Sequence, residues 1–188
     1  MNIGRVISSL VVAAVLIATA IDAQAQKAPN RRSSGVASLG EMGCRRIGGM
    51  GGYRTINEDI PIGREIFRAV AYLGDGSFLG TGIDRDHPTK VACRLAPVNA
   101  APQFKTLTLS FGLREDSSAL DGSVIVRLSV YKDGNFYGEQ TVSRGDKIRW
   151  PIDVRNTRSL ALETECVRPR KNSDSCPLIW VVEDILRK

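Results

Sequence analysis

Apolar and polar residues alternate in short runs between Phe104 and Cys166, and this pattern constrains the fold more than any other feature of the sequence. A period of two is typical of β-strands that have one buried face and one exposed face. Strands are predicted over residues 105–113, 123–132, 136–143, 147–154 and 160–165. Turn sequences such as Asp133-Gly134 separate them, because glycine accepts the positive φ that a tight turn requires. We therefore expect an antiparallel β domain.

Further strands are expected over residues 66–73, 77–82, 90–95 and 177–186. The first could instead form a helical turn, and the last is so continuously apolar that Trp180 is expected in the core. About eight or nine strands, spaced by roughly 8–12 residues, are typical of a sandwich or jelly roll. Sustained helical periodicity is missing after residue 25, which disfavours a parallel α/β sheet. The predicted class is all-β, an antiparallel β-sandwich or jelly roll.

Residues 1–25 have the pattern of a secretion signal. Arg5 precedes the uncharged stretch from Val6 to Ile21, and Ala23-Gln24-Ala25 fits the small-x-small cleavage rule. The alternative is a membrane anchor, but the stretch is shorter than the about 20 residues that span a bilayer. We expect cleavage after Ala25, no membrane-spanning segment afterwards, and a location outside the cytoplasm, either secreted, periplasmic or on the cell surface.

Residues 26–55 are predicted to be a flexible basic arm rich in Gly, Ser and Arg, followed by one domain over 56–188. The formal net charge of the chain is +6, and five cations of the arm contribute most of it: Lys27, Arg31, Arg32, Arg45 and Arg46. Such an arm either attracts an acidic surface or serves as a solvated tether. The glycines of Gly48–Gly52 are interpreted as a hinge. A nucleic-acid partner is not expected, because the chain is exported and no basic strand face interleaves with aromatic residues.

Four cysteines in an exported chain indicate two disulfides, and three pairings are possible. The preferred pairing joins Cys166 to Cys176 and Cys44 to Cys93. The first bond would close the polar loop between the last two strands, contributing about 2–3 kcal/mol, and the second would tie the arm to the domain, contributing about 4 kcal/mol. A metal site with four cysteine ligands is the alternative, but the sequence contains no close C-x2-C pair.

Few residues could support catalysis, so we do not expect an enzyme. His87 is the only histidine and lies in a turn-rich segment, where a solvent-facing position is expected. Glu115-Asp116 and Glu183-Asp184 are acidic pairs, but neighbouring side chains of an extended chain point to opposite sides. If the pairs met in space, Glu115, Asp116 and Glu183 could bind a structural Ca²⁺. The alternative is loop solvation and surface ion pairing, and no other cofactor is expected.

Recognition of a sugar would require exposed aromatic faces and a few fixed polar groups. Tyr131, Phe136, Tyr137 and Trp150 all lie in the predicted hairpins. Arg149 precedes Trp150 and Pro151 follows it, which suits an edge strand. The candidate ligand-binding residues are Trp150, Tyr137 and Arg149, with core packing as the alternative for each aromatic side chain.

Several segments from about Asp59 onwards keep the order and spacing of a known pattern. They are Gly82 with the stretch from His87 to Leu95, then Phe104–Asp116, Gly122–Gly134, Val154–Leu162, and Trp180 with Glu183 and Asp184. In these segments the chain resembles the NPCBM family, a carbohydrate-binding module of secreted proteins. It departs from that family at Cys176–Ile179, where the family has an acidic-His stretch, and at Asn156-Thr157, which replace a turn glycine.

The resemblance implies a galactose-binding-like β-sandwich and a secreted, non-catalytic carbohydrate-binding module. Its partner would be a glycan or an envelope polysaccharide. The alternative is an extracytoplasmic structural or protein-interaction domain, which a basic arm tethers to an acidic envelope surface.

Overall fold

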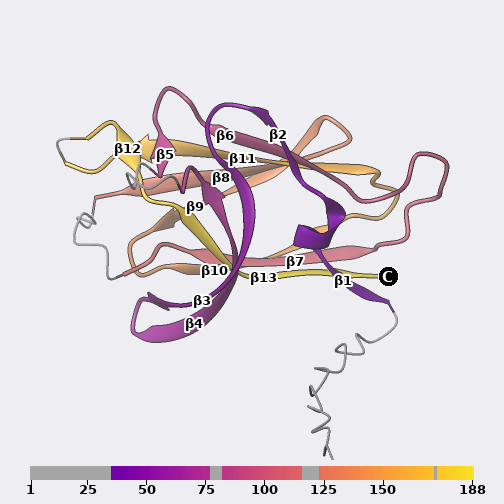
Figure 1. Cartoon of the computed structure of the whole chain (residues 1–188), viewed down its shortest axis with the longest axis horizontal. Helices are drawn as coiled ribbons and strands as arrows, with labels where there is room; N and C mark the ends of the chain where they lie inside the picture. Colours follow the sequence, from indigo (N-terminus) through magenta and orange to yellow (C-terminus); the bar gives the residue numbers. More distant parts are fainter. Residues whose placement is uncertain (1–34, 77–81, 116–122, 172) are drawn as a thin grey trace, which may run out of the picture. The chain divides into compact units, whose positions relative to one another are not determined.

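The computed structural model describes residues 35–76, 82–115, 123–171 and 173–188, which form two antiparallel sheets packed face to face (Figure 1). The first sheet has the order β10 (Lys147–Asp153), β7 (Thr106–Gly112), β13 (Ile179–Arg187), β4 (Glu65–Gly74), β3 (Gly52–Ile62), and β1 (Val36–Ser38) also pairs with β13. The second sheet has the order β2 (Arg45–Gly48), β6 (Thr89–Arg94), β11 (Ser159–Arg168), β8 (Ile125–Lys132), β9 (Asn135–Ser143). Two short strands, β5 (Ile83–Asp84) and β12 (Ser175–Cys176), pair separately, and Leu39–Met42 form the 3-10 helix η1.

The all-β sandwich is therefore confirmed, and most expected strands are present within a residue or two of their predicted bounds. The segment 66–73 is the strand β4 rather than a helical turn. The expected strand over 77–82 lies largely outside the described residues, as do the predicted signal sequence and the first part of the predicted arm. The prediction did not include β1, β2, β3, β5 and β12.

The core lies between the two sheets and is formed by alternate residues of their strands. In β7 and just beyond it, Leu107, Leu109, Phe111 and Leu113 are fully buried. The second sheet contributes a facing set that is equally buried: Val91, Val126, Leu128, Val130, Leu160 and Leu162. The period of two in the sequence thus corresponds to the apolar face that each strand turns to the core, although β7 also buries Thr108 and Ser110 on its other face.

The side chains of β13 divide between two clusters by strand alternation, and a β-bulge interrupts this alternation after Val181. The register with β7 shifts between Val181 and Glu183, so one extra residue lies in β13 at this point. Val181 points into the sandwich core, whereas Trp180 belongs to a smaller cluster that includes Ile60, Ile62 and Ala69. Trp180 is buried as expected, but outside the main core, where its ring lies 5.8 Å from that of Tyr72.

The predicted boundary of the flexible arm is wrong for residues 36–55, because these residues form β1, η1, β2 and the start of β3. Composition is misleading here, since few apolar side chains are needed to hold a segment that pairs through its backbone. Leu39 is 0% exposed and joins the core, while β1 pairs with the end of β13. The backbone N–H of Lys188 donates to the carbonyl of Gly35 at 2.9 Å, which places the two ends of the described fold side by side.

The glycines of residues 48–52 are not a hinge but a tightly packed connection between β2 and β3. Gly49 has φ +64°, and a Cβ atom there would overlap the carbonyl oxygen of Pro88. Gly51 has φ +77°, and a Cβ atom there would overlap the backbone of Gly74. Only glycine satisfies both the backbone angle and the lack of space.

Both disulfides of the preferred pairing are present, Cys44–Cys93 and Cys166–Cys176. The first joins the residue before β2 to β6, and therefore cross-links the N-terminal segment to the second sheet. The second closes the polar loop between β11 and β12. With both bonds formed, the chain has no free cysteine.

Asp184 forms a buried hydrogen-bond network that holds three parts of the N-terminal half. Its Oδ2 accepts hydrogen bonds from Tyr53 Oη at 2.7 Å, Ser38 Oγ at 2.7 Å and the Gly40 backbone N–H at 3.0 Å. Asp184 is 4% exposed, so water does not replace these donors. The carboxylate thus fixes β1, η1 and β3 to β13.

Burial raises the pKa of Tyr53 above its ordinary value of 10.0, and the charge of Asp184 and the hydrogen bond to it raise it further. In the unfolded chain this phenol ionises near pH 10, whereas in the folded protein it stays protonated. The stability it contributes is therefore fully present below pH 10 and is lost as the pH rises above it, by about 1.4 kcal/mol per pH unit.

We expect urea denaturation between pH 8 and pH 11 to show this fall in the free energy of unfolding for the native protein. Tyr53→Phe should lower stability by about 1 kcal/mol at pH 8, through loss of the hydrogen bond, but should show a flatter pH dependence. If the free energy of unfolding fell with pH equally in the two proteins, burial beside Asp184 would not be what keeps Tyr53 protonated.

Candidate functional site

The strands β9 and β10 lie at the same side of the sandwich, each at the edge of its own sheet. β10 is hydrogen-bonded to β7 on one side only, and Pro151 lies within it. Proline cannot donate to a neighbouring strand, so its presence suits an open edge. The two strands do not pair with each other, and side chains fill the space where they meet.

Trp150 and Tyr137 meet at this edge. Their ring centroids are 6.2 Å apart, with an angle of 31° between the ring planes. Trp150 is half-buried and packs against the sandwich core, whereas Tyr137 is 36% exposed. Gly138 leaves room for the indole, since a Cβ atom there would lie 3.3 Å from Trp150 Cζ2. Trp150 thus supports Tyr137 from the inside, and Tyr137 carries the exposed aromatic surface.

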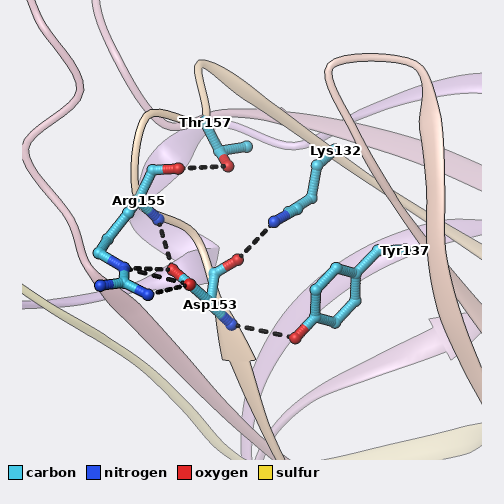
Figure 2. Close-up of polar contacts among 5 residues, drawn as sticks. All are labelled: Lys132, Tyr137, Asp153, Arg155 and Thr157. Atoms are coloured by element: carbon cyan, nitrogen blue, oxygen red, sulfur yellow. Dashed lines mark hydrogen bonds and ion pairs between the residues drawn. The ribbon is translucent and has the colours of Figure 1, made fainter.

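Polar groups surround Tyr137 and connect the two sheets (Figure 2). Lys132 Nζ lies 4.5 Å from the centroid of the Tyr137 ring and donates to the carbonyl of Asp153 at 3.0 Å. The backbone N–H of Asp153 donates to Tyr137 Oη at 3.3 Å. These contacts fix the orientation of the phenol ring against the end of β10.

Arg155 binds the carboxylate of Asp153 with two parallel hydrogen bonds, from Nε at 3.1 Å and from Nη2 at 2.6 Å (Figure 2). Its backbone N–H also donates to Oδ1 at 2.9 Å. Hydrogen bonds from the guanidinium, and then from this N–H, lower the pKa of Asp153 to about 2. The carboxylate is therefore charged at every physiological pH and can accept hydrogen bonds from hydroxyl groups.

These residues border a shallow groove of about 440 Å³, which we call the edge groove. It is lined by Lys105, Thr106, Tyr137, Pro151, Asp153 and Arg155. Its volume lies within the range of small-molecule sites, about 300–1,000 Å³. An aromatic surface beside charged donors and acceptors can hold an amphipathic, hydroxyl-rich ligand.

The structure separates Arg149 from Trp150. Trp150 pairs with the buried Leu109 and points inward, so Arg149, which pairs with Ser110, points to the outer face of the first sheet. There it borders a second depression of about 430 Å³, which we call the outer groove. The outer groove is lined by Phe67, Arg68, Ser110, Lys147, Arg149, Val182 and Glu183.

The calcium hypothesis gains no support from the described carboxylates. Glu115 lies beyond the end of β7 and accepts from Arg144 Nε at 2.8 Å. Glu183 contacts Ser110 within β7 and lies 3.4 Å from Arg149 Nε. Asp116 is outside the described residues, and the described residues contain no group of three or more side chains able to hold a metal ion. The two glutamates are therefore held in different surroundings by different arginines.

His87 lies in an exposed turn, with its side chain 64% exposed. Asp84 Oδ1 accepts from its backbone N–H at 2.9 Å and lies 3.0 Å from its Nδ1. The histidine thus stabilises a turn, as its position in the sequence suggests.

No helix in the part of the chain that the structure describes is long and apolar enough to cross a membrane.

Neither a family model nor a curated protein matches the sequence. Solved structures do match, and they give the chain the galactose-binding-like β-sandwich fold of carbohydrate-binding modules. A CBM51 module of a GH95 protein from Clostridium perfringens, solved with methyl-galactose, has a TM-score of 0.55 at 10% identity, over 80% of this chain and 99% of that one. The CBM51-2 and INT domains of Clostridium perfringens ZmpB give a TM-score of 0.56 at 15% identity.

A further structure of the ZmpB domains contains GlcNAc in complex with CBM51-2, and has a TM-score of 0.55. The match covers 81% of this chain but only 31% of either ZmpB chain, so this chain corresponds to one part of that larger protein. At these identities the likeness is one of fold.

Proposed function

We propose that this chain is an exported carbohydrate-binding module of the NPCBM type, which binds glycan without catalysing a reaction on it. The observation that carries the proposal is the edge groove, where an exposed tyrosine supported by a tryptophan lies beside a fixed carboxylate–guanidinium pair. The fold supports it, because the modules with this fold described above were solved with sugars.

In this proposal the Tyr137 ring contacts the apolar C–H face of a sugar, and Asp153 and Arg155 bind its hydroxyl groups. The carboxylate accepts hydrogen bonds, and the guanidinium donates them. Each side chain is already ordered by the other, and Lys132 holds the backbone of Asp153, so little side-chain entropy is lost when a sugar binds. The exposed position of the groove suits recognition of one part of a longer glycan.

Export is part of the proposal. Two disulfides are typical of proteins that reside in an oxidising compartment, and all four cysteines of the chain are used in them. The pattern of residues 1–25 favours secretion, to the periplasm or the cell surface. A non-catalytic role is supported by the exposed turn position of His87, the only histidine in the sequence.

The test is a glycan array with the purified protein and two variants of adjacent residues, Tyr137→Ala and Phe136→Ala. Phe136 is 58% exposed and contacts Tyr131 on β8, with ring centroids 5.6 Å apart, so it is a matched aromatic control outside the edge groove. We expect Tyr137→Ala to weaken glycan binding about tenfold or more, equivalent to about 1.4 kcal/mol, and Phe136→Ala to keep it.

Thermal melts of both variants should resemble that of the native protein, since neither side chain is buried in the core. The proposal fails if the native protein binds no glycan, or if the two substitutions weaken binding equally. In the latter case a protein-interaction surface on β9 becomes the better explanation.

A further inference from the structure

We propose that the ligand is an acidic glycan, and that Lys147 and Arg149 bind its anionic group in the outer groove. The inference rests on the proposed function, because it extends the same binding surface along β10. The anionic group is a carboxylate or a sulfate, which present the same chemistry to these two cations.

The outer face of β10 has the geometry for such a site. Side chains two residues apart in a strand point to the same side, so Lys147, Arg149, Pro151 and Asp153 share this face. Their partners on β7 are small or hydroxylated: Gly112, Ser110, Thr108 and Thr106. The outer groove lies where Lys147 and Arg149 of β10 adjoin Ser110 of β7 and the neighbouring residues of β13 and β4.

Lys147 is held by an aromatic ring rather than by a carboxylate. Lys147 Nζ lies 3.8 Å from the centroid of the Phe67 ring, and among the described residues it forms no ion pair. An aromatic ring orients an ammonium group but leaves its full charge available to a ligand.

Arg149 also has N–H donors that remain available for a ligand. Its side chain is 62% exposed and meets Glu183 only through Nε, at 3.4 Å. A guanidinium has five N–H donors in a planar fork, so the terminal nitrogens are available for two parallel bonds to a carboxylate or sulfate. Ser110 Oγ lies beside this pair, where it donates to Glu183 Oε2 at 3.1 Å.

The third cation of the outer groove has its own partners. Arg68 binds Asp59 at 2.7 Å and Asn57 at 3.1 Å. Because Arg68 is already paired, the remaining charged residues that line the outer groove are two cations, Lys147 and Arg149, and one carboxylate, that of Glu183. The outer groove is therefore positive. Its potential is therefore complementary to an anion.

The outer groove and the edge groove are parts of one path. Arg149 borders the first and Asp153 the second, and both lie on the same face of β10, about 13 Å apart along the strand. Pro151 lies between them and removes a backbone donor, which keeps this edge free of another strand. An extended glycan can lie along β10 with a neutral unit at Tyr137 and an acidic unit at Lys147 and Arg149.

The experiment compares polymers that differ only in charge. Binding of the purified protein to polygalacturonate and its methyl ester tests the carboxylate, and binding to dextran sulfate and dextran tests the sulfate. We expect at least one charged form to bind about tenfold more tightly than its neutral counterpart, with a preference that falls as ionic strength rises.

In the double variant Lys147→Gln, Arg149→Gln, the ratio of affinities for the charged and the neutral polymer should fall towards one. Arg45→Gln, Arg46→Gln is the matched control, because it removes the same charge from two exposed residues of β2 in the other sheet. It should retain the preference. Arg149→Lys tests whether the guanidinium binds the anion with two parallel hydrogen bonds. The variant keeps the positive charge but should bind the charged polymer several-fold more weakly.

Several outcomes would overturn the inference. Equal binding of charged and neutral polymers that depends on Tyr137 would leave the proposed function intact and remove the acidic class. Equal losses in the two double variants would indicate attraction by total charge alone, as would equal binding to single-stranded DNA or to phosphatidylglycerol vesicles. If none of the polymers binds, the inference fails, while the glycan array decides the proposed function separately.

Discussion

Replacing Asp184 with alanine is expected to lower the free energy of unfolding by about 3 kcal/mol. The substitution leaves the buried Tyr53 hydroxyl and the partly buried Ser38 hydroxyl without their acceptor, and leaves the Gly40 N–H with Ser38 Oγ alone. Each buried donor without a partner costs roughly 1–3 kcal/mol, and the carboxylate that linked β1, η1 and β3 to β13 is lost as well. Urea denaturation at neutral pH measures the change, which corresponds to a fall of about 6–12 °C in melting temperature.

Glu183→Ala is the natural control, since Glu183 is the adjacent carboxylate but is partly exposed, and it pairs with the exposed Arg149 and accepts from Ser110 on the outer face of the sheet. We expect this substitution to cost less than about 1 kcal/mol, because exposed ion pairs contribute little. Similar losses for the two variants would show that the network around Asp184 has no special role.

Replacing Gly49 with alanine is expected to cost at least about 3 kcal/mol, or to prevent folding. Its backbone has φ +64°, and the added methyl group would overlap the carbonyl oxygen of Pro88, so the backbone would have to move. Proteolysis and thermal unfolding of the variant would show the effect.

Gly43 provides a control with the same backbone angle. Its φ is also +64°, but a Cβ atom there has no neighbour within 4 Å. Gly43→Ala should therefore cost only the backbone penalty, about 1–2 kcal/mol. If the two variants were equally stable, the contact between Gly49 and Pro88 would not constrain the fold.

Much of the fold could be predicted because its strands bury one face. Leu107, Leu109 and Phe111 alternate with polar residues in the sequence, and each is fully buried. By contrast, β3 was missed because its central residues, Arg54 to Asp59, are mostly polar and a register shift between Thr55 and Glu58 breaks the period. The segment before it was missed although its disulfide was predicted, because one buried leucine and backbone pairing also hold it, and composition reveals neither.

The candidate site was predictable only in part. Tyr137 and Trp150 do lie together at an open edge, for which Pro151 was the signal. Arg149 could have been assigned to the opposite face from strand alternation alone. Lys132, by contrast, reaches Asp153 from the other sheet, and no local pattern reveals contacts between sheets. The pair Asp153 and Arg155 follows a strand at a spacing of two, which is a local signal that could have been found.

The hydrogen bond between Lys188 and Gly35 means that the described sandwich begins and ends at one point. Domains whose ends adjoin tolerate circular permutation and insertion into host proteins. A short peptide could therefore join these residues, and new termini could be opened at Asp133-Gly134 in the β8–β9 turn. The same geometry would allow the whole sandwich to be grafted into a surface loop of an unrelated scaffold without separating the two strands that flank the insertion.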